Sequence, residues 1–120
     1  MSQAEKFYHG RRDQAGTYAW VSQGQRAYAL PMRTDVRNHS PTGFNWGYGG
    51  SGPAQLALAI LCDLLGDETE AQDCYQRFKF EVIGKIKDDV WTMSGASIRI
   101  WYDRLEREIY LDPRDLPSRN

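Results

Sequence analysis

The chain has few of the residues on which metal sites and most catalytic centres depend. Its 120 residues include two cysteines and two histidines. Cys62 and Cys74 lack the close spacing of a zinc motif, and neither lies beside His9 or His39 in the sequence. The sequence therefore predicts no metal site, no cofactor and no catalytic residues. Both cysteines are expected to be free, buried thiols in a reducing compartment.

Long apolar runs are also missing. The most apolar segment, 54–65, is interrupted by Gln55 and Asp63 and is too short to span a bilayer. No basic stretch followed by an apolar one marks a secretion signal at the N-terminus. We therefore expect a cytoplasmic protein without membrane partners.

No strong excess of charge of either sign is present, since the net charge is −1. Residues 1–52 hold six Lys and Arg against three Asp and Glu (+3), and residues 53–120 hold nine against thirteen (−4). Neither half has the dense basic patch that general nucleic-acid binding requires. The mild positive charge of the first half would suit one phosphate group or an acidic partner.

The first third of the chain predicts β-structure. The segments 6–11, 17–22 and 26–30 are short and rich in aromatic or small apolar residues, and turn residues separate them. Gly24 can adopt the positive φ of a hairpin turn between the second and third segments. We expect a three-stranded antiparallel sheet.

The rest of the chain predicts three helices, and hence an α+β fold. The first begins at Pro53 and ends at Leu65, where Gly66 can form a left-handed cap. Apolar residues surround it, so it should be the central core element. The second runs from about 67–69 to Lys87, and Ser94 can cap the third. Residues 1–111 are expected to form one domain, and 112–120 a flexible tail.

A long segment rich in glycine and aromatic residues precedes the first helix. The stretch Gly47–Gly52 fits the pattern G-x-G-x-x-G, but helical residues follow it where a dinucleotide-binding unit needs another strand. A chain of this length is also small for a doubly wound fold. A dinucleotide-binding fold is therefore not expected.

Two interpretations of this segment stay open. Its backbone N–H groups, next to a helix N-terminus, could bind an anion while an aromatic ring stacks on a base and arginines neutralise charge. The residues proposed for that ligand site are Trp46, Tyr48, Gly49, Gly50, Ser51, Arg12 and Arg37. Alternatively, the glycines allow close packing over the helix, and the aromatic residues cover the core.

Other polar residues point less clearly to chemistry. His39 and Ser40 are the one adjacent pair of a base and a hydroxyl, but neighbouring residues seldom orient as base and nucleophile. Asp63 lies on the buried helix, so it needs a partner. We expect a structural ion pair with Arg12 or Arg26.

The block HSPTGFNWGYGGSGPAQLALAIL resembles the hallmark of a family of small bacterial and phage proteins with a domain of unknown function. The resemblance extends to the first strand, to Ala71, Tyr75, Phe78 and Lys79, and to Trp91, over about residues 6–102. Such proteins often travel on prophages, plasmids and integrative elements. The resemblance implies this habitat and no activity.

Two functions from different classes follow. The first is a non-enzymatic accessory protein that binds a host or element-encoded complex, for example as an inhibitor of a host defence system like an anti-CRISPR protein. Its partner-binding residues would be Arg99, Arg104 and Arg107 on the third helix. The alternative is a binder of a nucleotide or phosphorylated metabolite at Gly47–Gly52. The sequence leaves homo-oligomerisation open.

Overall fold

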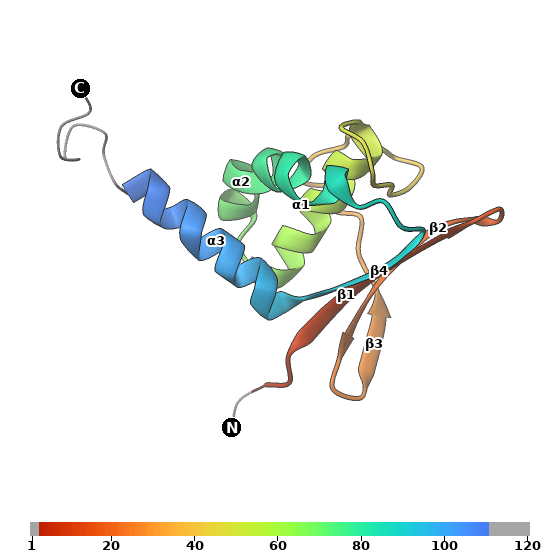
Figure 1. Cartoon of the computed structure of the whole chain (residues 1–120), viewed down its shortest axis with the longest axis horizontal. Helices are drawn as coiled ribbons and strands as arrows, with labels where there is room; N and C mark the ends of the chain where they lie inside the picture. Colours follow the sequence, from red (N-terminus) through yellow and green to blue (C-terminus); the bar gives the residue numbers. More distant parts are fainter. Residues whose placement is uncertain (1–2, 111–120) are drawn as a thin grey trace.

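One four-stranded antiparallel sheet and three α-helices make up the computed structural model, which describes residues 3–110 (Figure 1). The strands are β1 (Lys6–Asp13), β2 (Gly16–Gln23), β3 (Arg26–Ala29) and β4 (Val90–Ser94), in the order β3-β2-β1-β4. The expected α+β class is confirmed. The tail expected over 112–120 lies outside the described residues.

The prediction of three strands is wrong, because β4 adds a fourth on the other side of β1. Trp91 on β4 lies opposite Gly10 on β1, and Thr92 lies opposite His9. These partners are about eighty residues apart in sequence, and β4 is only five residues long. A short segment without regular polar alternation carries little local evidence of a strand, and only its distant partner creates it.

The N-terminal hairpins follow the expected pattern. β1 pairs with β2 from Lys6 opposite Gln23 to Asp13 opposite Gly16, and β2 pairs with β3 from Trp20 opposite Ala29 to Gln23 opposite Arg26. Gly24 has φ 61°, which fits a two-residue hairpin turn with glycine at the first central position.

The helices are α1 (Ser51–Leu65), α2 (Glu68–Glu81) and α3 (Gly95–Tyr110), with a short 3₁₀ turn η1 (Ile83–Lys85) after α2. α1 begins two residues before the predicted start and ends where predicted, with Gly66 at φ 65° as its cap. α2 ends six residues before the expected Lys87. The Ser94 hydroxyl accepts a hydrogen bond from the Ser97 N–H (3.1 Å), as expected of a helix cap.

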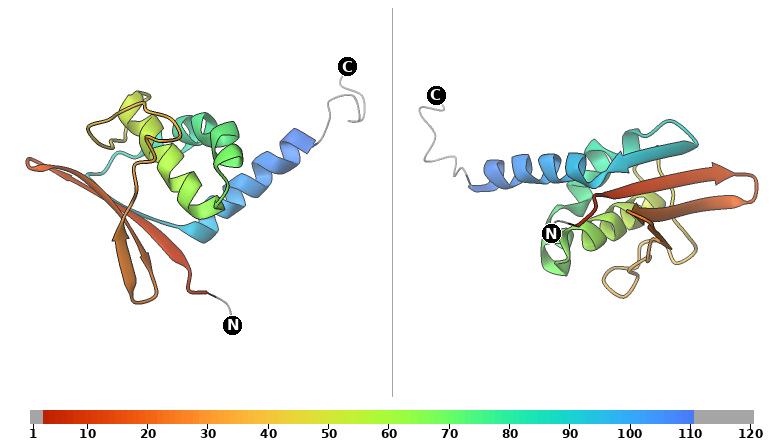
Figure 2. Two further views of the ribbon diagram at one scale, coloured as in Figure 1. Left: turned by 180° about the vertical axis from the view of Figure 1, so that it is seen from behind. Right: turned by 90° about the horizontal axis from the view of Figure 1, so that it is seen from below.

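α1 is the centre of the core. Every residue from Gly52 to Cys62 is buried, which confirms the central role expected from its apolar surround. The sheet covers one side of α1 and α2 packs on another, whereas α3 leaves the end of β4 and runs away from the sheet (Figures 1 and 2). Cys62 and Cys74 are free and buried, as expected.

Asp63 near the end of α1 joins the helix to the sheet, but not through the arginines expected from sequence. Its Oδ1 accepts hydrogen bonds from Tyr8 (2.5 Å) and Lys6 (3.0 Å), and its Oδ2 accepts one from Tyr28 (2.7 Å). Burial and the bonds to Asp63 raise the pKa of Tyr8 and of Tyr28 above the usual range for tyrosine. Neither expected partner bonds to Asp63: Arg12 donates to other groups at the opposite end of β1, and the Arg26 guanidinium lies over the Tyr28 ring.

A single buried amide holds the long segment between β3 and α1. The Gln55 side chain is fully buried on α1. Its Oε1 accepts hydrogen bonds from the backbone N–H groups of His39 (2.8 Å) and Ser40 (3.2 Å). Its Nε2 donates to the carbonyls of Met32 (2.6 Å) and Arg37 (3.0 Å). Four bonds from one side chain therefore fix the path of a segment that has no helix or strand of its own.

Candidate functional site

Trp46, the first residue expected to stack on a ligand, lies in the core. Its side chain is 1% exposed and its ring meets Trp91 edge to face, with 5.5 Å between ring centroids. The indole Nε1 donates to the Asp88 carbonyl (2.9 Å). Trp46 therefore offers no free ring face to a ligand in this conformation.

Arg12 holds the aromatic segment against the sheet. Its guanidinium donates to Asn45 Oδ1 (2.6 Å), to the Trp46 carbonyl (3.0 Å) and to Asp89 (3.0 Å). It also lies over the Trp46 ring, 4.8 Å from the centroid. These contacts join β1, the segment before α1 and the start of β4, so the group is engaged in structure.

Tyr48 lies above the glycines and is 49% exposed. A Cβ atom at Gly50 would come within 2.4 Å of the Tyr48 ring, so this close approach requires glycine. The ring therefore covers one side of the glycine segment, and its other side faces solvent.

The N-terminus of α1 has no side-chain cap. The first bond within the helix runs from the Ala54 N–H to the Gly50 carbonyl (3.1 Å), so the preceding N–H groups lack helical partners. A polar pocket of about 280 Å³ opens beside them, with hydroxyl and amide groups in its wall. It is lined by Thr17, Ser40, Thr42, Gly43, Phe44, Asn45, Tyr48, Ser51 and Gly52.

Of the predicted ligand residues, the structure brings only Tyr48 and Ser51 to the wall of this pocket. Arg37 lies elsewhere and donates to Gln72 on α2 (3.1 Å). The sequence interpretation named Lys79 only within the family resemblance and gave it no role at this segment, whereas Lys79 is buried on α2 and donates to the Gly49 carbonyl (3.5 Å). That role could be assigned only once the contact between α2 and the glycine segment was known.

The arginines expected to bind a partner are spread over α3. All three are exposed. Arg99 donates to the Leu64 carbonyl at the end of α1 (2.9 Å), which gives it a structural contact. Arg104 lines a small pocket between α2 and α3 with Arg77 and Glu108.

The sheet has one face that no described helix covers (Figures 1 and 2). The register places eleven residues on it in three cross-strand rows: Ala27, Ser22, Phe7 and Ser94; Ala29, Trp20, His9 and Thr92; Tyr18, Arg11 and Val90. We call these residues the open face. Arg11 is its one charged residue apart from any charge on His9, and Phe7, Tyr18 and Val90 are 38, 41 and 63% exposed.

The open face is internally ordered. His9 stacks on Trp20, with 5.2 Å between ring centroids and 20° between ring planes. The two His9 ring nitrogens lie 2.8 Å from the Ser22 hydroxyl and 3.0 Å from the Thr92 hydroxyl. The Arg11 guanidinium lies over the Tyr18 ring at 5.1 Å. Cross-strand contacts of this kind hold the aromatic rings in place before any partner arrives.

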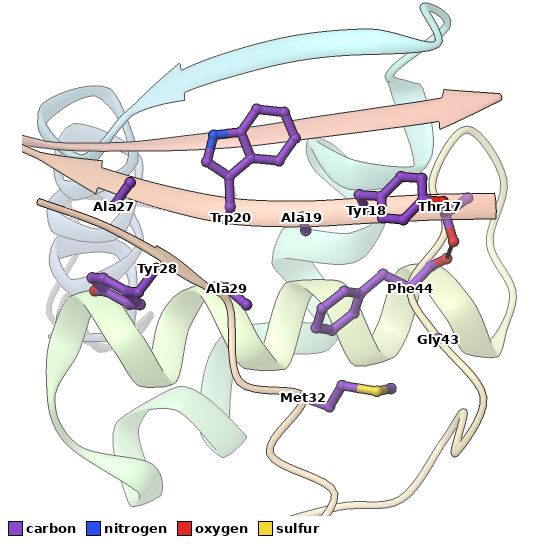
Figure 3. A pocket seen from close by; sticks show the side chains of 10 residues that line it. All are labelled: Thr17, Tyr18, Ala19, Trp20, Ala27, Tyr28, Ala29, Met32, Gly43 and Phe44. Atoms are coloured by element: carbon purple, nitrogen blue, oxygen red, sulfur yellow. Dashed lines mark hydrogen bonds between the residues drawn. The ribbon is translucent and has the colours of Figure 1, made fainter. Parts of the chain in front are cut away.

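An apolar groove of about 560 Å³ continues from the open face around the edge of the sheet, and we call it the edge groove (Figure 3). Figure 3 shows the Trp20 ring on the side of β2 away from α1, whereas Phe44 and Met32 lie on the side of α1. The groove is lined by Thr17, Tyr18, Ala19, Trp20, Ala27, Tyr28, Ala29, Met32, Gly43 and Phe44.

Sequence reasoning did not find the open face. Aromatic residues occupy both alternating sets of β1, with Tyr8 inside and Phe7 outside, so polarity does not distinguish the two faces. Nothing in the local sequence indicates that the helices gather on one side only.

Other kinds of site are not seen in the described part of the chain. Among residues 3–110, no three His, Cys, Asp or Glu side chains are grouped to hold a metal ion. None of the helices within that range is long and apolar enough to cross a membrane.

Comparison with known proteins identifies a family whose function is unknown. A family model described as a family of unknown function (DUF6166) matches residues 8–104. No curated protein and no solved structure matches the chain. Any function must therefore be argued from the geometry of this molecule.

Proposed function

The chain belongs to the family of unknown function DUF6166, and we propose from its own geometry that it acts by binding a partner protein on the open face. The observation that carries this proposal is the exposure of Phe7, Tyr18 and Val90 on a sheet face that no described element covers. Contiguous exposed apolar surface on a small domain is typical of an interaction site.

The charge of the open face favours a protein over a nucleic acid. Arg11 is paired with Asp13 at the margin of the face (3.5 Å), so little positive charge remains to meet phosphates. Single-stranded nucleic acids bind aromatic platforms that lie in clearly basic grooves. An aromatic surface with a single, paired charge instead matches the composition of the centre of protein interfaces.

The size of the open face sets a limit on what it can do alone. Four strands and three cross-strand rows cover roughly 400 Å² at ordinary strand spacing. A stable interface buries about 800 Å² on each partner. The partner must therefore also contact residues beyond the open face, at a sheet edge or on a neighbouring segment.

Capture of a partner from lysate of the natural host, with matched variants, tests the proposal. Trp20→Glu and Tyr18→Glu place a charge on the open face and should reduce capture of the partner by about tenfold or more. Arg104→Glu and Arg107→Glu change charge on α3 and should leave capture unchanged. If only the α3 variants reduced capture of the partner, the interface would lie on α3, as expected from the sequence, and the proposal of binding on the open face would be wrong.

The resemblance suggests a finer role within this proposal, that of an accessory protein of a phage or mobile element that inhibits a host defence complex. Cells with an active defence system should then allow more phage plaques when they express the wild-type chain. Trp20→Glu should abolish the gain while the protein remains folded. Equal plaque numbers with and without the wild-type chain would contradict this role.

A specific observation favours a second candidate, the binding of a small anion such as a phosphorylated metabolite at the start of α1. Uncapped N–H groups beside a polar pocket of about 280 Å³ provide donors for such a ligand. Ser51→Asp puts a carboxylate in the first turn, which should stabilise the free helix and repel an anion. A thermal shift with a panel of nucleotides that is lost in this variant would support the site, and no shift with any of them would contradict it.

A further inference from the structure

The strand β3 forms a bare edge of the sheet. It is four residues long, and Arg26, Ala27 and Ala29 are exposed. Proteins usually protect such an edge with charged side chains, proline, a bulge or a covering loop. Apart from its short length and Arg26 at its start, β3 has none of these within its four residues.

The hydrogen-bond alternation shows which backbone groups are free. The Leu30 N–H donates to the Ala19 carbonyl (3.1 Å), so Ala19 and Leu30 form a hydrogen-bonded pair. Every second pair of an antiparallel ladder is of this kind, which places Tyr28 and Arg26 in the other such pairs. The N–H and C=O groups of Ala27 and Ala29 therefore point away from β2. None of the described loop or side-chain hydrogen bonds uses them.

The edge groove has walls on both sides of this edge. On the open face, Trp20 stands beside the small side chains of Ala27 and Ala29. On the other side, the walls are Phe44 and Met32 from the segment that follows β3 (Figure 3). Successive side chains of an extended strand point to opposite faces of a sheet, so a strand beside β3 would place them alternately against these two walls.

The charge beside the groove is positive. The Arg26 guanidinium lies over the Tyr28 ring at 5.7 Å. It has no carboxylate partner within the described residues, whereas Arg33 is paired with Asp35 and Glu68. A ligand that lies along β3 would meet this exposed cation at the hairpin end of the strand.

We propose that the edge of β3 accepts an extended apolar segment of a partner protein as a fifth strand, with an acidic residue of that segment beside Arg26. Main-chain bonds to Ala27 and Ala29 would supply affinity, and the two walls of the edge groove would select apolar side chains. The inference rests on the proposed function in that the partner is a protein. It adds the contact area that the open face alone does not provide.

A strand fits these observations better than a small ligand or a second copy of the chain. A small apolar ligand would leave the outward N–H and C=O groups of Ala27 and Ala29 unused. A second copy paired through its own β3 would set alanine against alanine and leave the edge groove unfilled. A segment with larger apolar side chains satisfies the backbone groups and fills both sides.

The test uses a library of displayed random peptides selected on the full chain, followed by synthetic copies of the enriched sequences. We expect enriched peptides to alternate apolar residues and to carry Asp or Glu at one end. Ala27→Pro removes an outward N–H and should weaken binding by about tenfold or more, because proline blocks strand addition at an edge. Arg104→Glu on α3, which lies outside both the open face and the edge groove, is the control and should change affinity by less than about twofold.

Amide exchange measured by NMR gives an independent reading if a proline variant fails to fold. In the wild-type chain, the Ala27 and Ala29 amides should exchange fast when free and at least about tenfold more slowly with bound peptide. The Val90 and Thr92 amides, on the outer edge of β4, should not change.

Three results would overturn the proposal. The first is that no peptide enriches above background, and the second is that an enriched peptide binds without slowing the Ala27 and Ala29 amides. If such a peptide is lost with Trp20→Glu, the open face stands as a binding site and only strand addition fails. The third is slow exchange of the Ala27 and Ala29 amides in the free protein together with a dimer in analytical sedimentation, which would assign the edge of β3 to a second copy of the chain.

Discussion

The two faces of this sheet are built from the same strands and have opposite surroundings. On one face, Tyr8, Val21 and Trp91 are buried beneath the helices. On the other, Phe7 and Tyr18 are partly exposed although they are equally aromatic. The difference teaches that apolar content alone does not separate residues that stabilise this fold from residues available for binding. Whether a residue of the sheet is buried depends on which face the helices cover. The predictions below test this difference between the two faces.

The largest loss of stability is expected on the covered side, from Gln55→Leu. This change leaves four backbone groups of the 32–40 segment without their partner. We expect a loss of about 4 kcal/mol in the free energy of unfolding, measured by urea denaturation. Gln72→Leu on α2, where the amide is only half-buried, is the control and should cost less than about 1 kcal/mol. Similar losses in both variants would show that the segment does not depend on Gln55.

Gly10→Val should be the next most damaging change. A Cβ atom at Gly10 would lie 2.3 Å from the Trp91 indole, so the ring must move out of the core. We expect a cost of about 3 kcal/mol in the same assay. Arg11→Val, on the next residue of β1 but on the open face, is the matched control and should change stability by less than about 1 kcal/mol. If the two variants lose equal stability, the two faces do not differ as we describe.

The pH dependence of stability should reveal the buried hydroxyl of Tyr8. Its pKa is raised by burial and by the bond to Asp63, so the folded protein keeps this proton when the unfolded chain loses it. The stability gained is complete below the ordinary tyrosine pKa of about 10 and falls as the pH rises above it, by about 1.4 kcal/mol per pH unit.

Tyr8→Phe supplies the comparison for that measurement. The variant should be less stable near pH 8, by about 1.5 kcal/mol, because Asp63 loses a donor. Its stability should then fall less steeply than that of the wild type above pH 10. Parallel curves for the two proteins in that range would contradict the role given to Tyr8.

The smallest effect on stability is expected on the open face. Tyr18→Ser and Val90→Ser remove exposed apolar side chains and should each change the free energy of unfolding by less than about 1 kcal/mol. Their effect should instead appear in partner binding. A loss of about 3 kcal/mol from either change, measured by urea denaturation, would mean that the open face is part of the core of this chain.

The candidate site could be predicted from sequence only in part. The glycine segment and the helix that follows it were recognised from Gly47–Gly52 and Pro53, because their conformational preferences are local. The burial of Trp46 was one of the two interpretations left open, and the sequence could not choose it because it depends on Trp91 and Asp88, more than forty residues away. The contact of Lys79 with the glycine segment was missed for the same reason.

The partner of Asp63 illustrates the same limit. The sequence required a partner for a carboxylate on an apolar helix, and the structure provides Lys6, Tyr8 and Tyr28. An arginine was the expected donor because charge pairing is the simplest solution. Two tyrosine hydroxyls and a lysine lie within reach because the β1 and β3 register brings them to the end of α1.

By itself, the sequence determined the local features of this protein: the tight turn at Gly24, the cap at Gly66, and a helix so apolar that it had to be central. Each follows from backbone preference or from the periodicity of neighbouring residues. Only the tertiary structure decided that β4 joins β1, that Trp46 is covered while Tyr18 is not, and that β3 ends the sheet as a bare edge. These features depend on contacts between segments far apart in the chain, and no local preference specifies which segments meet.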